Sequence, residues 1–161
     1  MKKIGIILVI SIFSFGSAMA QLVKVDQEVF GMDCAPCAYG LERGLKKMGG
    51  LGSIKVSLND GKAYLTLSPD NKLTLQKIQE EVKNNGFSAR RAEVVLTGEL
   101  CKSEGTWQIK VNDETFQVTS DTTREIIRSL NPGIIKARLL IKDKSDRELS
   151  GTWEARIEEI M

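Results

Sequence analysis

The chain has 161 residues, of which 42% are hydrophobic and 27% are charged, and its formal net charge is +2. This composition is typical of a globular protein and excludes a disordered or collagen-like chain. The near balance of charges gives no indication of binding to nucleic acid or to an anionic membrane. Three cysteines are too few for a disulfide-rich scaffold, because any pairing leaves one of them over.

The first 20 residues have the pattern of an export signal. Two lysines precede an apolar run over residues 4–15, and Ala18-Met19-Ala20 has the small residues of a cleavage site. The run is too short to span a bilayer comfortably. We therefore expect residues 1–20 to be removed after Ala20, so that the mature protein is periplasmic and not inserted in a membrane. Two of the 23 basic residues and no acidic residue lie in this segment, which leaves the remainder formally neutral.

The next segments predict a strand, a loop with two cysteines and a helix. Residues 22–30 alternate apolar and polar side chains, which indicates a β-strand. The loop GMDCAPC, residues 31–37, follows. From Pro36 to about Met48 the apolar residues fall at helical spacing, and two glycines end the pattern. Pro36 suits the first helical position, where no backbone donor is missed.

A hairpin, a second helix and a further strand come next. Residues 54–58 and 63–67 both alternate in polarity, and Asn59-Asp60-Gly61 between them favours a tight turn. Residues 75–82 again show helical spacing, and another alternating run covers 92–98. The order strand, helix, strand, strand, helix, strand predicts an α+β, ferredoxin-like βαββαβ sandwich, with the helices on one face of an antiparallel sheet.

The remainder of the chain predicts a small, mostly β module with a barrel as a candidate architecture. Hairpin strands are expected at 106–111 and 114–119, a short helix at 122–130, and further strands around 137–141 and 153–157. Trp107 and Trp153 are expected in its core. The predicted organisation is therefore a signal peptide over 1–20, a ferredoxin-like domain over 21–98 and a β-rich module over 99–161.

Cys34 and Cys37 lie where the first predicted strand passes into the first predicted helix. The free N–H groups and the positive dipole end of a helix start favour thiolate over thiol. Histidine is absent and Ala38 follows Cys37, which excludes haem attachment through a Cys-x-x-Cys-His motif. Three cysteines also exclude a four-cysteine zinc or iron–sulfur cluster within one chain.

Two thiolates on one loop suit a soft d¹⁰ ion that accepts low sulfur coordination, such as Cu(I) or Hg(II). Cu(I) is our first choice. Zn(II) or Cd(II) would require more ligands, of which Asp33 could supply one carboxylate oxygen.

Residues 22 to about 98 resemble the heavy-metal-associated (HMA) domain family, which includes exported mercury-binding proteins, copper chaperones and N-terminal modules of metal-pumping ATPases. The family's Gly-Met-x-Cys-x-x-Cys loop is matched by Gly31, Met32, Cys34 and Cys37, and the element order and the pair Gly86-Phe87 also match. Many relatives carry Thr or Ser at the position of Asp33.

Other side chains near the loop have supporting roles in this interpretation. We expect Met32 to anchor the loop in the core and Phe87 to pack beneath the sulfurs. Asp33 is expected to be a solvated turn residue or a helix cap, with a ligand role as the alternative. Cys101 is expected to be a free, partly buried thiol, with intermolecular pairing or a third metal ligand as alternatives. The basic stripe of the first helix, Arg43, Lys46 and Lys47, is expected to be a solvated face.

The functional hypothesis is a carrier rather than an enzyme. Cys34 and Cys37 would bind one soft metal ion and pass it by thiolate exchange to a metal-transporting protein or to another carrier with a Cys-x-x-Cys loop. A structural disulfide and a periplasmic thiol–disulfide oxidoreductase are alternatives for the same two cysteines. An adaptor or sensor for Zn(II), Cd(II) or Hg(II) is a further alternative.

Overall fold

The computed structural model describes residues 19–144 and 150–161. Almost all of the predicted export signal therefore lies outside the described residues, and its cleavage stays a prediction. Within the described ranges, none of the helices is both long and apolar enough to cross a membrane.

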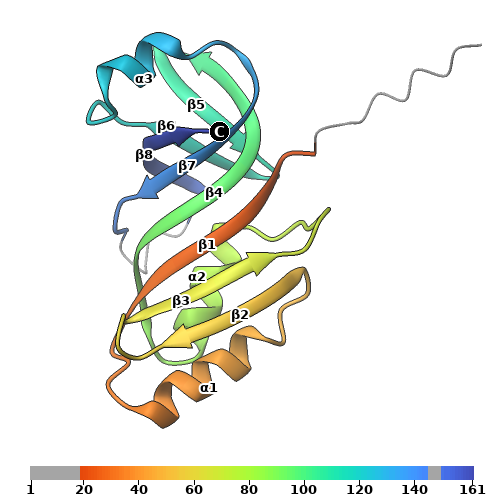
Figure 1. Ribbon diagram of the computed structural model, residues 1–161, viewed down its shortest axis with the longest axis vertical. Helices are drawn as coiled ribbons and strands as arrows, with labels where there is room; N and C mark the ends of the chain where they lie inside the picture. Colours follow the sequence, from red (N-terminus) through yellow and green to blue (C-terminus); the bar gives the residue numbers. More distant parts are fainter. Residues whose placement is uncertain (1–18, 145–149) are drawn as a thin grey trace, which may run out of the picture.

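The first unit is an antiparallel sheet of four strands in the order β2-β3-β1-β4, with two helices against one face (Figure 1). This confirms the ferredoxin-like βαββαβ arrangement. Its elements are β1 (Gln21–Phe30), α1 (Ala35–Leu45), β2 (Leu51–Ser57), β3 (Lys62–Leu67), α2 (Leu75–Asn84) and β4 (Ser88–Ser103).

The core of this unit forms where alternating strand residues meet the apolar sides of the helices. Leu41 and Leu45 of α1, and Ile78 and Val82 of α2, are fully buried. Complete burial of one such side chain contributes about 1.5–3 kcal/mol relative to exposure. The elements therefore arise from the periodicities seen in the sequence.

Helix α1 differs from its prediction at both ends. It begins at Ala35, one residue before Pro36, and it ends at Leu45 rather than at Met48. The early end has a local cause, because the N–H groups of Lys47 and Met48 bond to carbonyls only three residues back and tighten the last turn.

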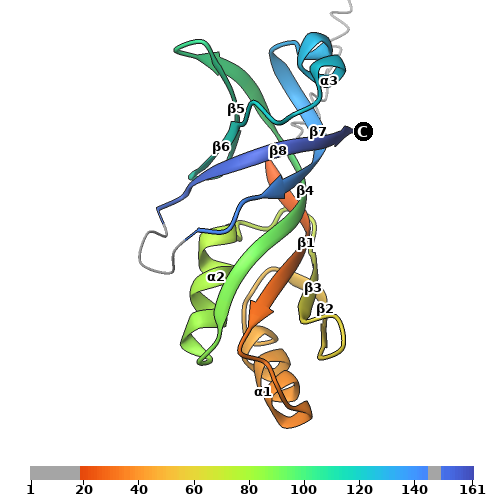
Figure 2. The same cartoon turned by 90° about the vertical axis from the view of Figure 1, so that its left-hand side faces the viewer.

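The second unit is a closed five-stranded barrel, which agrees with the mostly β module expected there. Its strands pair in the order β4-β5-β6-β8-β7, and a further pairing of β7 with β4 closes the ring (Figure 2). Strands β6 and β8 run parallel, and the other neighbours are antiparallel. Beyond β4, its elements are β5 (Thr106–Val111), β6 (Glu114–Val118), α3 (Arg124–Ser129), β7 (Gly133–Ile141) and β8 (Thr152–Ile160).

The two units share strand β4, so the boundary predicted at residues 98 and 99 falls inside one continuous strand. On one edge, β4 pairs with β1 up to Thr97 and then with β5 from Glu99 onward. Gly98 lies at this change of partner. A Cβ there would come within 2.6 Å of Ile109 Cγ2 and 2.9 Å of the Lys110 carbonyl oxygen, which leaves no room for a side chain.

A buried carboxylate joins the barrel to the first unit. Glu114, at the start of β6, is 3% exposed and accepts bonds from the N–H groups of Leu75 (2.7 Å) and Gln76 (2.8 Å), which open helix α2. It also accepts the indole N–H of Trp153 at 2.9 Å. Burial raises the pKa of Glu114, although these three donors oppose the rise. The barrel thus supplies a hydrogen-bond acceptor for backbone N–H groups that have no partner within the first turn of α2.

The two tryptophans differ in burial. Trp153 is 1% exposed, as expected for a core residue. Trp107 is only half-buried and lies at the open end of the barrel, so its prediction as a core residue is correct only in part. Both tryptophans follow a Gly-Thr pair, and in both cases the strand begins at the threonine.

Candidate metal-binding loop

The loop between β1 and α1 places Cys34 directly at the helix start. Gly31 has a φ of +89°, a conformation that favours glycine and turns the chain out of β1. Cys34 is the N-cap residue of α1, with extended backbone angles, and its carbonyl accepts the N–H of Ala38 at 3.1 Å. Sequence reasoning proposed Asp33 as one candidate cap, but the capping residue is Cys34 itself.

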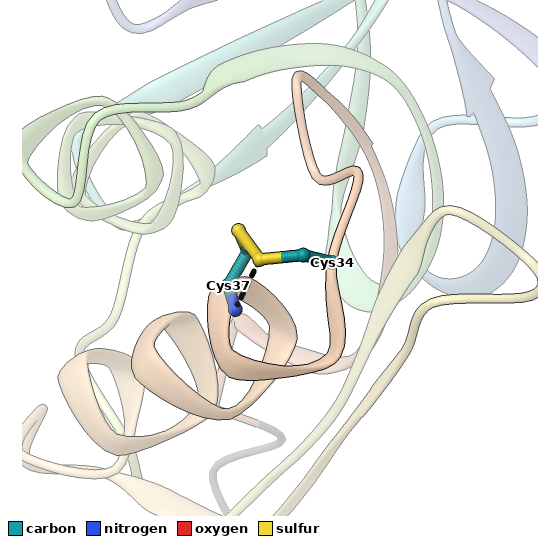
Figure 3. Close-up of a disulfide and its surroundings, with 2 residues drawn as sticks. All are labelled: Cys34 and Cys37. Atoms are coloured by element: carbon teal, nitrogen blue, oxygen red, sulfur yellow. Dashed lines mark hydrogen bonds between the residues drawn. A yellow bond between two sulfur atoms is a disulfide. The ribbon is translucent and has the colours of Figure 1, made fainter.

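The two sulfurs lie side by side at the exposed end of the helix (Figure 3). They are joined as a disulfide, with Cα atoms 5.1 Å apart. The backbone N–H of Cys37 donates to Sγ of Cys34 at 3.2 Å. Cys34 is exposed and Cys37 is half-buried. The pair is therefore in its oxidised form, and binding of a metal ion requires its reduction to two thiols.

Met32 and Phe87 connect the loop to the hydrophobic core. Met32 is 6% exposed and belongs to the hydrophobic core, which agrees with the anchoring role expected for it. Phe87 follows α2 and packs partly buried on the same core. Its Cδ1 would lie 4.0 Å from a Cβ on Gly31, so the ring is beside the loop. Burial of Met32 therefore anchors the loop that carries the two sulfurs to the core.

Asp33 is exposed and lies between Met32 and Cys34. In the described part of the chain, no group of three or more Cys, Asp, Glu or His side chains is arranged to hold a metal ion. Asp33 therefore does not complete a three-ligand site with the two cysteines in this conformation. A ligand role for it stays a prediction.

Two exposed aromatic residues flank the loop, and the sequence pattern did not single them out. Phe30 is 64% exposed with the guanidinium of Arg90 over its ring at 4.9 Å, and Tyr39 is 64% exposed with Arg43 at 5.8 Å. The alternation along β1 predicts a polar residue at position 30. The aromatic ring of Phe30 departs from this pattern, and this is the signal that could have identified it. Exposed aromatic rings with cations beside them are common at protein interfaces.

The basic stripe at the C-terminal end of α1, formed by Arg43, Lys46 and Lys47, is solvent-exposed, as expected. Lys46 pairs with Glu42 one turn earlier at 2.8 Å, and Glu42 also accepts the N–H of Val56 on the edge strand β2 at 3.0 Å. The bond from Lys46 and then the bond from Val56 hold the pKa of Glu42 below its usual range. Glu42 therefore connects α1 to the edge strand β2, while the basic stripe is exposed to solvent.

Cys101 is a free, half-buried thiol, which agrees with the expectation from the sequence. It lies on β4 opposite Gln108 of β5, in the barrel rather than at the loop. The structure therefore does not bring Cys101 together with Cys34 and Cys37.

Comparison with protein-family models finds a match to the heavy-metal-associated domain over residues 28–88. This segment contains the whole loop from Gly31 to Cys37, both helices and the pair Gly86-Phe87. The resemblance to this family that the motifs predicted is therefore confirmed for residues 28–88.

Curated relatives of the chain include copper-transporting ATPases. Copper-transporting ATPase 2 of Rattus norvegicus is 28% identical over 128 residues, which cover 77% of this chain and 9% of that protein. The copper-exporting P-type ATPase of Bacillus subtilis is 26% identical over 146 residues, covering 81% of this chain and 18% of the ATPase. The chain thus spans less than a fifth of the length of either relative.

Similar solved structures include a copper-binding domain from HMA7, a P-type ATPase. It is 29% identical, covers 45% of this chain and 92% of its own, and has a TM-score of 0.39. The CopZ metallochaperone is 23% identical, covers 41% of this chain and 97% of its own, and also has a TM-score of 0.39.

Proposed function

We propose that this protein is an exported carrier that binds one Cu(I) ion through Cys34 and Cys37 and passes it on by thiolate exchange. The observation that supports this most is an exposed sulfur pair at the start of α1, in a segment that matches the heavy-metal-associated domain, with Met32 buried in the core and Phe87 beside the loop. Several relatives of this domain are named as copper transporters. Periplasmic location is proposed from the pattern of residues 1–20.

Two features of the pair suit binding followed by release. The helix start and the N–H of Cys37 favour a thiolate on Cys34 once the disulfide is reduced. Two sulfur ligands leave a Cu(I) ion open to a third, and the exposed side of Cys34 lets an incoming thiolate approach. Transfer can then proceed through a three-coordinate intermediate, so the ion is never free in solution.

The proposal is tested by anaerobic titration of the reduced protein with Cu(I) in competition with a chromogenic chelator. We expect one ion per chain for the wild type. The variant C34S/C37S should lose this binding, whereas C101S is the matched control and should keep it. Equal binding by C34S/C37S would refute the proposal.

The exchange step makes a kinetic prediction. If the acceptor attacks the bound ion, the rate of transfer to a dithiol acceptor should rise in proportion to acceptor concentration. A rate independent of acceptor concentration would mean that the ion dissociates first, and it would contradict thiolate exchange.

A second candidate function is thiol–disulfide exchange, which is favoured by the disulfide and by the exposed Cys34. An insulin-reduction assay separates the two functions. Catalytic turnover that is lost in C34S and kept in C101S would favour the oxidoreductase. The absence of turnover, together with one Cu(I) per chain, would favour the carrier. Zn(II), Cd(II) and Hg(II) sensing or adaptor roles are tested by competition among the metals.

A further inference from the structure

A cleft is lined by residues of α3 and of the neighbouring barrel segments. Helix α3 lies at the opposite end of the molecule from α1 (Figure 1). The volume of the cleft is about 490 Å³, within the range of small-molecule sites. The start of β5, the segment that follows β6 and helix α3 form its walls. The cleft is remote from the cysteine loop, and the proposed carrier function does not use it.

The charged residues that line the cleft are both arginines. Arg124 and Arg128 lie four residues apart, so they project from the same side of α3. Neither forms an ion pair or hydrogen bond with another side chain in the described part of the chain. The lining residues include no carboxylate. The neighbouring acid Asp121 is paired with Lys142, at 4.0 Å.

Part of the cleft lining is apolar. Trp107, Val118 and Ile127 form this part and pack against the barrel core. Lys102 Nζ lies 5.6 Å from the centroid of the Trp107 ring, which adds a third cation beside the cleft. The indole N–H of Trp153 bonds to Glu114, whereas that of Trp107 has no acceptor among the described residues. The cleft therefore offers a half-buried aromatic face next to two guanidinium groups.

We propose that this cleft binds a small organic anion. Its carboxylate or phosphate group would lie against Arg124 and Arg128, because a guanidinium donates two parallel hydrogen bonds to such a group. Its apolar body would pack on Trp107 and Ile127. An acidic peptide fits less well, because the two arginines lie within a single turn of α3 and provide for one anionic group rather than for a row of them.

The two tryptophans provide the test, because each gives one indole N–H signal in a ¹⁵N-resolved NMR spectrum. Titration of the full mature chain with 4-phenylbutyrate should shift the Trp107 signal saturably and leave the Trp153 signal in place. The neutral analogue 4-phenylbutanol should bind at least about tenfold more weakly, because it lacks the charged acceptor. Phenyl phosphate in a parallel titration shows which anionic group is preferred.

Variants connect the signal to the arginines. R124Q/R128Q should weaken 4-phenylbutyrate binding about tenfold or more, with the Trp153 signal unchanged as proof that the barrel remains folded. K47Q/K72Q removes two exposed positive charges from the first unit and should bind as the wild type does. Equal binding by R124Q/R128Q and wild type would overturn the proposal. So would a Trp107 signal that responds to a tetra-aspartate peptide but to neither aromatic anion.

Discussion

The two units of this protein bury their cores in different ways. The first covers one face of an open sheet with α1 and α2, and the cysteine loop lies where β1 leaves that sheet. The second closes five strands around an interior filled by side chains such as Phe116 and Trp153. The loop at the end of the open sheet is exposed, whereas the β4–β7 pairing of the barrel joins its first and last strands. The unit that carries the candidate metal site therefore continues through strand β4 into a closed barrel.

Two connections couple the units. Strand β4 belongs to both sheets, and Glu114 of the barrel accepts the first N–H groups of α2. At its other end, α2 leads to Phe87, which lies beside Gly31 of the loop. Helix α2 thus extends from the barrel to the candidate site. Because of these two connections, we expect substitutions in the barrel core to destabilise the first unit as well.

The largest effect is expected for F116A in the barrel core. Phe116 is fully buried opposite Ile109 and Trp153, so its loss should lower the free energy of unfolding by about 3–5 kcal/mol. Both tryptophans report on the barrel, whereas helical circular dichroism reports mainly on α1 and α2. We expect both signals to move to lower denaturant together. A first unit that keeps its wild-type midpoint would show that the units unfold independently.

The shared strand can be tested at Gly98. A Cβ there would meet Ile109, Val111 and the Lys110 carbonyl at less than 3 Å, so G98A should destabilise the protein by about 1–3 kcal/mol. G40A is the matched control, because Gly40 lies in α1 with open space around it and alanine there should stabilise the helix by about 0.5–1 kcal/mol. Denaturant unfolding measures both variants. A G98A variant that is as stable as the wild type would contradict the lack of space for a side chain where β4 changes its partner from β1 to β5.

The carboxylate between the units makes a prediction about pH. E114Q replaces one acceptor oxygen with an NH₂ group beside N–H donors, and it should cost about 1–3 kcal/mol. Because burial raises the pKa of Glu114, the folded state binds a proton that the unfolded state has already lost. The stability advantage of the wild type over E114Q should therefore be largest below the ordinary pKa of Glu and shrink as pH rises through the raised pKa.

This pH dependence is measured as the difference in the free energy of unfolding between wild type and E114Q, from about pH 4 to pH 8. An advantage that grows with pH would mean that the three donors outweigh burial and depress the pKa. That result would contradict a raised pKa for Glu114 in the folded protein, but it would not affect the connection of the two units through β4.

The smallest effect is expected for D33A. Asp33 is exposed and is not arranged with the cysteines as a three-ligand group. Its removal should leave the affinity of the reduced protein for both Cu(I) and Cd(II) unchanged in chelator competition. A selective loss of Cd(II) binding would show that its carboxylate is a ligand and would favour the Zn(II) or Cd(II) alternative.

Much of the first unit could be predicted because its signals are local. Helical spacing placed Leu41 and Leu45 on one side of α1, and the turn chemistry at Gly61 fixed the hairpin. The motif also placed Cys34 and Cys37 at a helix start. The unbroken course of β4 was missed because Gly98 was taken as a boundary, although the alternation continues to Leu100.

The closure of the barrel could not be predicted in the same way. It depends on the pairings β4–β7 and β6–β8, which join strands far apart in the sequence. Nothing near Glu114 in the sequence indicates that its carboxylate is buried, because its partners lie 38 and 39 residues away. The oxidation state of Cys34 and Cys37 depends on the redox environment as well as on the loop.

The central claim is tested most directly by native mass spectrometry of the reduced mature protein in the presence of Cu(I), Zn(II), Cd(II) and Hg(II) together. The account predicts a single species with one Cu(I) per chain, also formed by C101S and absent from C34S/C37S. A protein that remains metal-free, or a C34S/C37S variant that still carries the ion, would contradict it.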